Sequence, residues 1–198
     1  MILTENEKNI IADTDFLPSK IVVMDKIRSL FSEVRQELRN TINESGFIYP
    51  VETDIANGKI FKGENYNSLP YVILDYPKLY SSTSTFTFRT MFYWGCFFSA
   101  TIHISGESLN KYRTAIKKNI SSLLDDQIYF CVNDNPWEYH YEKSNYVLLN
   151  NKKIGLIEKR DFIKLSKKFD LEQYKILPYL VDNYYQTILK LLSLTLND

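Results

Sequence analysis

The order of hydrophobic and polar positions predicts a long amphipathic helix in the first quarter of the chain. Between about Lys20 and Glu44, apolar side chains recur at the i, i+3, i+4, i+7 spacing of one helix face, and charged side chains occupy the other. Gly46 is well placed to end this helix, because glycine adopts the left-handed conformation without strain. Residues 1–17 lack this pattern and are expected to form a loose N-terminal arm.

Two short patterns before residue 78 predict strands. Asn57-Gly58 favours a tight hairpin turn, which would pair Ile55 with Ile60. Residues 69–76 form an apolar run with prolines near both ends, which suits a short strand.

Residues 83–105 carry the clearest strand pattern and are interrupted only by Gly95-Cys96. A two-residue turn there predicts a hairpin with Arg89 opposite Ile102. One face would then carry Thr87, Arg89, Met91, Tyr93, Phe98, Ala100, Ile102 and Ile104. The other would carry Phe86, Phe88, Thr90, Phe92, Trp94, Phe97, Ser99, Thr101, His103 and Ser105. Since neither face suits solvent, we expect the hairpin to be central or to form one wall of a pocket.

The C-terminal half predicts a helix from Ser108 and a closing helix from Pro178, whose apolar arc is wider than one contact requires. Between them lie four strand patterns, at residues 127–132, 137–141, 146–149 and 161–169. The whole order predicts one α+β domain over residues 1–198, with a mostly antiparallel sheet and about three helices gathered on one face.

Composition narrows the function classes. Lys and Arg number 24, as do Asp and Glu, so the formal net charge is zero and a nucleic-acid partner is not expected. The two cysteines are too few for a disulfide framework, which favours a reducing compartment. The N-terminus does not resemble a signal peptide, and no apolar run is long enough to span a membrane. We therefore expect a soluble cytoplasmic protein without a membrane partner.

The common catalytic and cofactor motifs are absent from the sequence. It contains no glycine-rich nucleotide loop, no HExxH and no GxSxG. The two histidines, His103 and His140, lie in different predicted strands without further ligands at metal-binding spacing. We expect neither a metal nor a cofactor.

Arg89, Asp75 and His103 are the first candidate site residues. Arg89 lies in the middle of an apolar strand, where it would either clamp an anionic ligand or form a structural ion pair, with Asp75 as a partner in both cases. His103 would face aromatic side chains and small hydroxyls, as in a ligand pocket. It is a weak candidate for a catalytic acid or base, and the alternative is a packed histidine.

Four further residues complete the candidate ligand site. Glu64 and Tyr66 lie on a predicted loop beside a buried strand, where they would contact a ligand or stabilise a turn. Phe88 and Trp94 would stack on a ligand or pack in the core.

Three segments resemble an uncharacterised bacterial protein family with no known activity. They are GENY at 63–66, LPYVILDYP at 69–77, and RTMF followed by WG between 89 and 95. The resemblance covers mainly residues 60–106, and it implies one structural unit without implying any chemistry.

Three functions remain open from the sequence. The first is a non-catalytic interaction protein that self-associates into a homo-oligomer. The second is a binder of a small, anionic molecule in an aromatic pocket, and the third is a metal-free enzyme that uses His103. We expect the first of these, with the ligand binder and the enzyme as the alternatives.

Overall fold

The computed structural model describes residues 1–193 and contains one seven-stranded antiparallel sheet, in the order β1-β2-β3-β4-β7-β5-β6. The strands are β1 Lys59–Tyr66, β2 Leu69–Tyr80, β3 Ser84–Tyr93, β4 Phe97–Ser105, β5 Tyr129–Cys131, β6 Tyr146–Leu148 and β7 Phe162–Phe169. The α-helices are α1 Glu5–Ala12, α2 Phe16–Glu44, α3 Gly106–Asn119, α4 Asn151–Ile154 and α5 Leu177–Leu192. Short 3-10 turns are η1 Ile120–Leu123, η2 Ile157–Lys159 and η3 Leu171–Ile176. The predicted α+β class is confirmed, with five α-helices in the described chain instead of about three.

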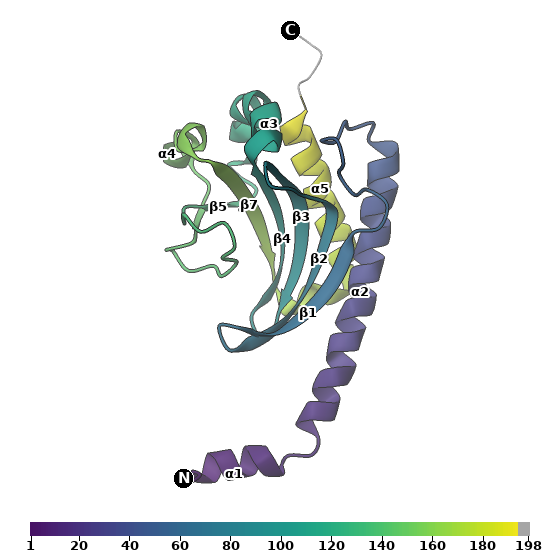
Figure 1. The fold of residues 1–198 in the computed structure, drawn as a ribbon, viewed down its shortest axis with the longest axis vertical. Coiled ribbons are helices and arrows are strands. Elements are labelled where there is room, and N and C mark those ends of the chain that lie inside the picture. The colour runs from purple at the N-terminus through teal and green to yellow at the C-terminus, as the bar shows by residue number, and fades with distance from the viewer. Residues whose placement is uncertain (194–198) are drawn as a thin grey trace.

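Helices α2 and α5 lie side by side on one face of the sheet and form the main core with it (Figure 1). α2 is 29 residues long and buries one stripe of apolar side chains at helical spacing. α5 contacts both α2 and the sheet, where Tyr184 and Tyr185 pack against Phe88. These two sets of contacts explain its wide apolar arc.

The β3–β4 hairpin turns over three residues, 94–96, because Tyr93 pairs with Phe97. Gly95 has a φ of +68° in this turn, which glycine adopts without strain. The backbone N–H of Cys96 donates to the Tyr93 carbonyl at 3.0 Å and closes the turn. The two-residue turn predicted from the sequence is therefore wrong by one residue.

This difference in register moves every side chain of β4 to the face opposite to the predicted one. Arg89 lies opposite Thr101 instead of Ile102, and Thr87 lies opposite His103. The helix-facing side of the hairpin is consequently apolar apart from Thr90, and most of the polar side chains collect on the other side. Together with their partners on β7 they form what we call the polar face: Thr87, Arg89, Thr101, His103, Lys164 and Ser166.

The predicted hairpin at Asn57-Gly58 is also wrong. The strand that begins at Lys59 pairs with β2, and Asp54 forms an isolated bridge with Lys78. The Asp54 carboxylate accepts hydrogen bonds from the backbone N–H groups of residues 56–58. These hydrogen bonds hold residues 54–58 as a loop, although Asn57-Gly58 favours a hairpin turn.

Two further strand predictions differ from the structure. The strand expected over residues 69–76 continues to Tyr80 through an irregularity between Asp75 and Lys78. Residues 137–141 form no strand in the described chain. They belong to an irregular connection between β5 and β6, residues 132–145, which we call the cover segment.

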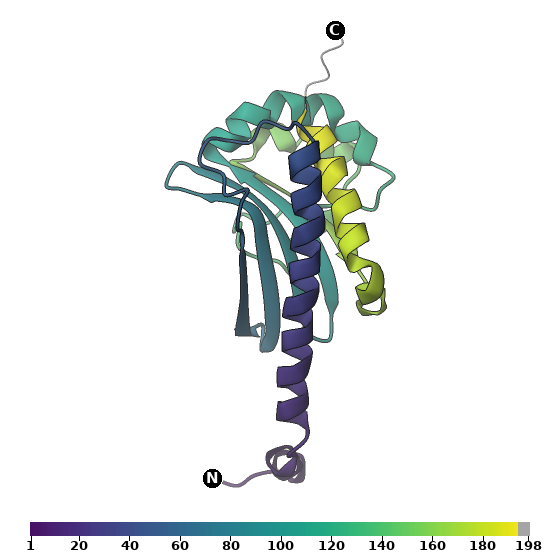
Figure 2. The same ribbon diagram turned by 90° about the vertical axis from the view of Figure 1, so that its right-hand side faces the viewer.

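The N-terminal arm contains the helix α1, which lies at the far end of α2 and away from the sheet (Figures 1 and 2). A capping box between Thr4 and Glu7 begins α1. None of the residues of α1 is buried.

Candidate functional site

A buried ion pair between Arg89 and Asp75 anchors the polar face. The two residues are neighbours on β3 and β2. Arg89 donates from Nε to Asp75 Oδ1 at 2.7 Å and from Nη2 to Asp75 Oδ2 at 2.8 Å. The Tyr80 hydroxyl donates to the same carboxylate at 2.9 Å. Because Asp75 occupies the guanidinium fork, Arg89 is a fixed positive group and no free anion clamp.

Lys164 is the second cation on the polar face, and its side chain is fully buried. Its ammonium group donates to the carbonyl of Pro136 at 2.9 Å and to that of Glu138. It also lies 3.9 Å from the centroid of the Tyr139 ring. Burial lowers the pKa of Lys164 to about 7, and Arg89 adds to this effect. Cys131 and Glu138 oppose it.

His103 lies between two aromatic rings, with centroids 5.3 Å from Trp137 and 5.8 Å from Phe162. Its side chain is 1% exposed, and its Nδ1 has no hydrogen-bond partner in the described chain. Burial, with the nearby charges of Lys164 and Arg89, lowers its pKa to about 3. The imidazole is therefore uncharged at neutral pH.

Unpaired polar atoms concentrate around these groups. The described chain has six buried side-chain polar atoms without a hydrogen-bond partner, and four of them belong to Thr87, His103, Tyr139 and Tyr146. Thr87 Oγ1 lies near the Tyr80 hydroxyl, and Tyr146 Oη lies near the Thr101 hydroxyl. Neither contact has the geometry of a hydrogen bond. Thr87 and His103 are cross-strand neighbours, and both tyrosine rings contact Lys164.

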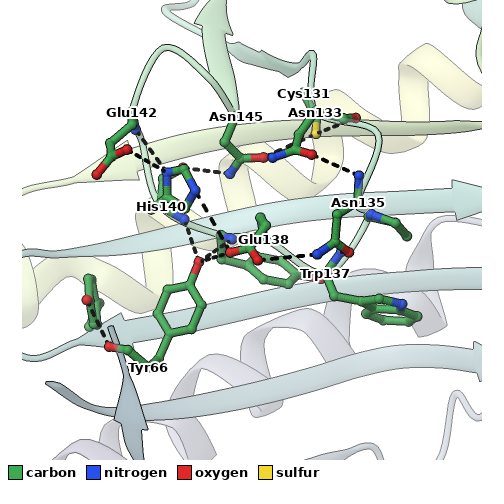
Figure 3. A network of polar contacts seen from close by, with 12 residues as sticks. Tyr66, Cys131, Asn133, Asn135, Trp137, Glu138, His140, Glu142 and Asn145 are labelled. Carbon is green, nitrogen blue, oxygen red and sulfur yellow. Dashed lines mark hydrogen bonds and ion pairs between the residues drawn. The ribbon is translucent and has the colours of Figure 1, made fainter. Parts of the chain in front are cut away.

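The cover segment is held over the polar face by a small number of directed contacts (Figure 3). The Tyr66 hydroxyl accepts from the N–H groups of Tyr139 and His140, at 2.8 Å and 3.0 Å, and donates to Glu138 at 2.9 Å. Arg160 donates to the Asn133 carbonyl at the other end of the segment. An open cleft of about 580 Å³ follows its outer side.

The structure brings together four of the residues singled out in the sequence. Arg89, Asp75 and His103 share one face of the sheet, and Tyr66 holds the segment that covers it. The expectation that Arg89 and His103 lie on opposite faces is therefore wrong.

The other three candidates lie elsewhere. Phe88 lies on the helix-facing side, in contact with α5. Trp94 packs against Phe16 of α2. Glu64 is exposed and pairs with Lys20.

Sequence reasoning missed Lys164 and Tyr139. The signal for Lys164 is its position between Phe162 and Ser166 on one side of a strand whose other side begins with Ile163 and Leu165. A lysine there is ordinary on a solvent-facing strand, and only the order of the strands shows that it is buried. Tyr139 belongs to an irregular segment and carries no sequence signal.

Comparison with protein-family models, with curated proteins and with solved structures finds no match to this chain. No group of three or more His, Cys, Asp or Glu residues in the described part of the chain could hold a metal ion. Within residues 1–193, no helix combines the length and the apolar character needed to cross a membrane.

Proposed function

We propose that the protein is a non-catalytic binding domain for a small anionic molecule, which it holds on the polar face beneath the cover segment. The observation that carries the proposal is the concentration of unpaired polar atoms around Lys164. Buried polar groups in folded proteins are paired in roughly 90% of cases or more. An unpaired one costs about 1–3 kcal/mol, which hydrogen bonds to a ligand would offset.

The charge on the polar face favours an anion. Arg89 and Lys164 are both buried, and the one buried carboxylate beside them, Asp75, is committed to Arg89. The ammonium group of Lys164 has only carbonyl oxygens and aromatic rings as close partners. A carboxylate or a tetrahedral oxyanion would supply the missing negative charge, and the hydroxyls of Tyr139 and Tyr146 are available as donors.

The same geometry argues against the metal-free enzyme that would use His103. A general acid or base works best with a pKa near the operating pH. The pKa of His103 is lowered to about 3, far below that range. The Ser166 hydroxyl is hydrogen-bonded to the hydroxyls of Thr101 and Tyr141, so it is not a free nucleophile.

A ligand would reach this face by displacing the middle of the cover segment, residues 133–144, which forms no strand. It is held by Tyr66 and Arg160, and from the polar face by Lys164, which donates to two of its carbonyls. The ring of Tyr139 also packs on Arg89 and Lys164. An irregular segment that covers a site in this way is suited to act as a lid.

The experiment uses native mass spectrometry of protein purified without added ligand, followed by thermal unfolding in sulfate and in acetate. These anions represent the tetrahedral and the planar class. The proposal predicts either a retained small mass or an increase in Tm with one of them. The increase should disappear in Lys164→Met and persist in Lys167→Met, a neighbouring lysine on the helix-facing side of β7.

Lys164→Met also removes a buried charge, so we expect the variant to fold. The absence of both a retained mass and any stabilisation by either anion would contradict the proposal. Equal stabilisation of the two variants would contradict it as well.

A further inference from the structure

The N-terminal arm and the first turns of α2 extend beyond the end of the sheet (Figure 2), and they carry exposed apolar side chains. The side chains of Phe16, Leu17, Ile21 and Val22 are each at least half exposed. In α1, which has eight residues, none is buried. A helix of that length is marginal in water without a packing partner.

The uncovered surface continues into a groove between α2 and η3. The groove has a volume of about 970 Å³, and its apolar lining includes Val22, Val23, Leu30 and Tyr174. Contiguous exposed apolar surface of this kind marks interaction sites in soluble proteins.

The charged side chains that line this groove are Asp25, Lys26, Glu33 and Lys175, and two of them are arranged for a second copy of the same helix. Lys26 and Glu33 both line it, seven residues or about 10.5 Å apart along the helix axis. Neither forms an ion pair within the described chain. Midway between them lies the small side chain of Ser29, also on the groove. An antiparallel α2 that crosses here would place each Lys26 opposite the Glu33 of the other copy.

Other occupants fit the surface less well. The arm that carries the apolar residues also carries Glu5, Glu7, Asp13 and Asp15, which an anionic membrane would repel. The chain has a formal net charge of zero, so two copies experience no net long-range repulsion.

We infer that the protein forms a symmetric dimer through the groove face at the middle of α2, with reciprocal Lys26–Glu33 pairs around a two-fold axis near Ser29. A two-fold interface uses the same patch on both subunits, so every contact occurs twice. The apolar groove residues and the arm are then covered by the partner. This inference is independent of the proposed ligand site.

The test is sedimentation velocity of the full chain, with charge-reversed variants. Lys26→Glu alone should weaken the dimer at least tenfold, because it creates two repulsive pairs, and Glu33→Lys alone should do the same. The double variant Lys26→Glu/Glu33→Lys should restore it. An equimolar mixture of the two single variants should also form a dimer, since both pairs are then attractive.

Lys143→Glu, an exposed change far along the chain, is the matched control and should leave the dimer intact. Circular dichroism establishes that each variant is folded. A monomer at high micromolar concentration would overturn the inference. A dimer unaffected by both single reversals would overturn it too, since it would use another surface.

Discussion

Arg89 and Asp75 meet in two parallel hydrogen bonds, of 2.7 Å and 2.8 Å, that join β3 to β2 within the buried polar face. This bidentate geometry fixes the guanidinium plane, and Tyr139 lies over it with its ring centroid 4.6 Å from the Arg89 Cζ atom. The pair therefore supports the cover segment from below, and it leaves Lys164 as the cation without a carboxylate partner.

Breaking the pair on one side should strongly destabilise the fold. Asp75→Asn leaves the Arg89 charge buried without its counterion, and we expect a loss of about 3–5 kcal/mol in the free energy of unfolding. The measurement is urea denaturation. In the double variant Asp75→Leu/Arg89→Met both charges are absent, so most of the stability should return. A loss below about 1 kcal/mol in Asp75→Asn, the range of exposed pairs, would show that the pair is not desolvated.

His103 should make the protein sensitive to acid. Its folded-state pKa of about 3 lies below its ordinary value of 6.5, so the unfolded chain takes up the proton first. Stability attributable to His103 is therefore lost as the pH falls from about 6.5 towards 3, with a slope of up to about 1.4 kcal/mol per pH unit. His103→Gln should flatten this slope between pH 6.5 and 4.5, measured by urea denaturation. An equal slope in the parent and the variant would place the acid sensitivity elsewhere.

Lys164 should have a corresponding effect at alkaline pH. Its folded-state pKa of about 7 lies below the ordinary 10.5, so the folded protein releases this proton first as the pH rises. Stability should increase from about pH 7 to 9.5, with a slope of up to about 1.4 kcal/mol per pH unit. Lys164→Met should be more stable than the parent at pH 7 and should lack the increase. If Lys167→Met lost the increase instead, Lys164 would not be the group that titrates.

Tyr66 should control how often the cover segment opens. Tyr66→Phe removes the acceptor for the N–H groups of Tyr139 and His140 and the donor to Glu138. We expect amide hydrogen exchange in the cover segment to accelerate about tenfold. This corresponds to a decrease of roughly 1.4 kcal/mol in the free energy of opening. Exchange in β3 and β4 should stay unchanged. The control is Tyr71→Phe, which keeps the ring contact between Tyr71 and Tyr66. Similar acceleration in both variants would assign the effect to general loosening.

Much of the fold could be predicted from the pattern of the sequence. The apolar stripe that ends before Gly46 predicts α2 to its last residue, Glu44, and β7 begins one residue after its predicted start. Both signals are local, because periodicity depends on near neighbours alone. The N-terminal boundary of α2 was missed by a turn, since Phe16 and Leu17 do not face the core.

The candidate site was less predictable because it depends on register and strand order. A one-residue error at Gly95 was enough to separate Arg89 from His103 in the prediction, although both residues were singled out. Lys164 joins them because β7 inserts between β4 and β5, a long-range pairing that no local pattern encodes. The cover segment has no periodicity at all.

The most direct test of the proposed anion site is the affinity for sulfate and acetate at pH 6 and pH 8, measured by calorimetry. Neither anion changes its charge appreciably between these values, whereas Lys164 does, because its pKa is about 7. Since the charged ammonium group is the form that binds an anion, affinity should fall about tenfold from pH 6 to pH 8. It should be lost in Lys164→Met at both values. Affinity that is independent of pH and unchanged in Lys164→Met would contradict the proposed site.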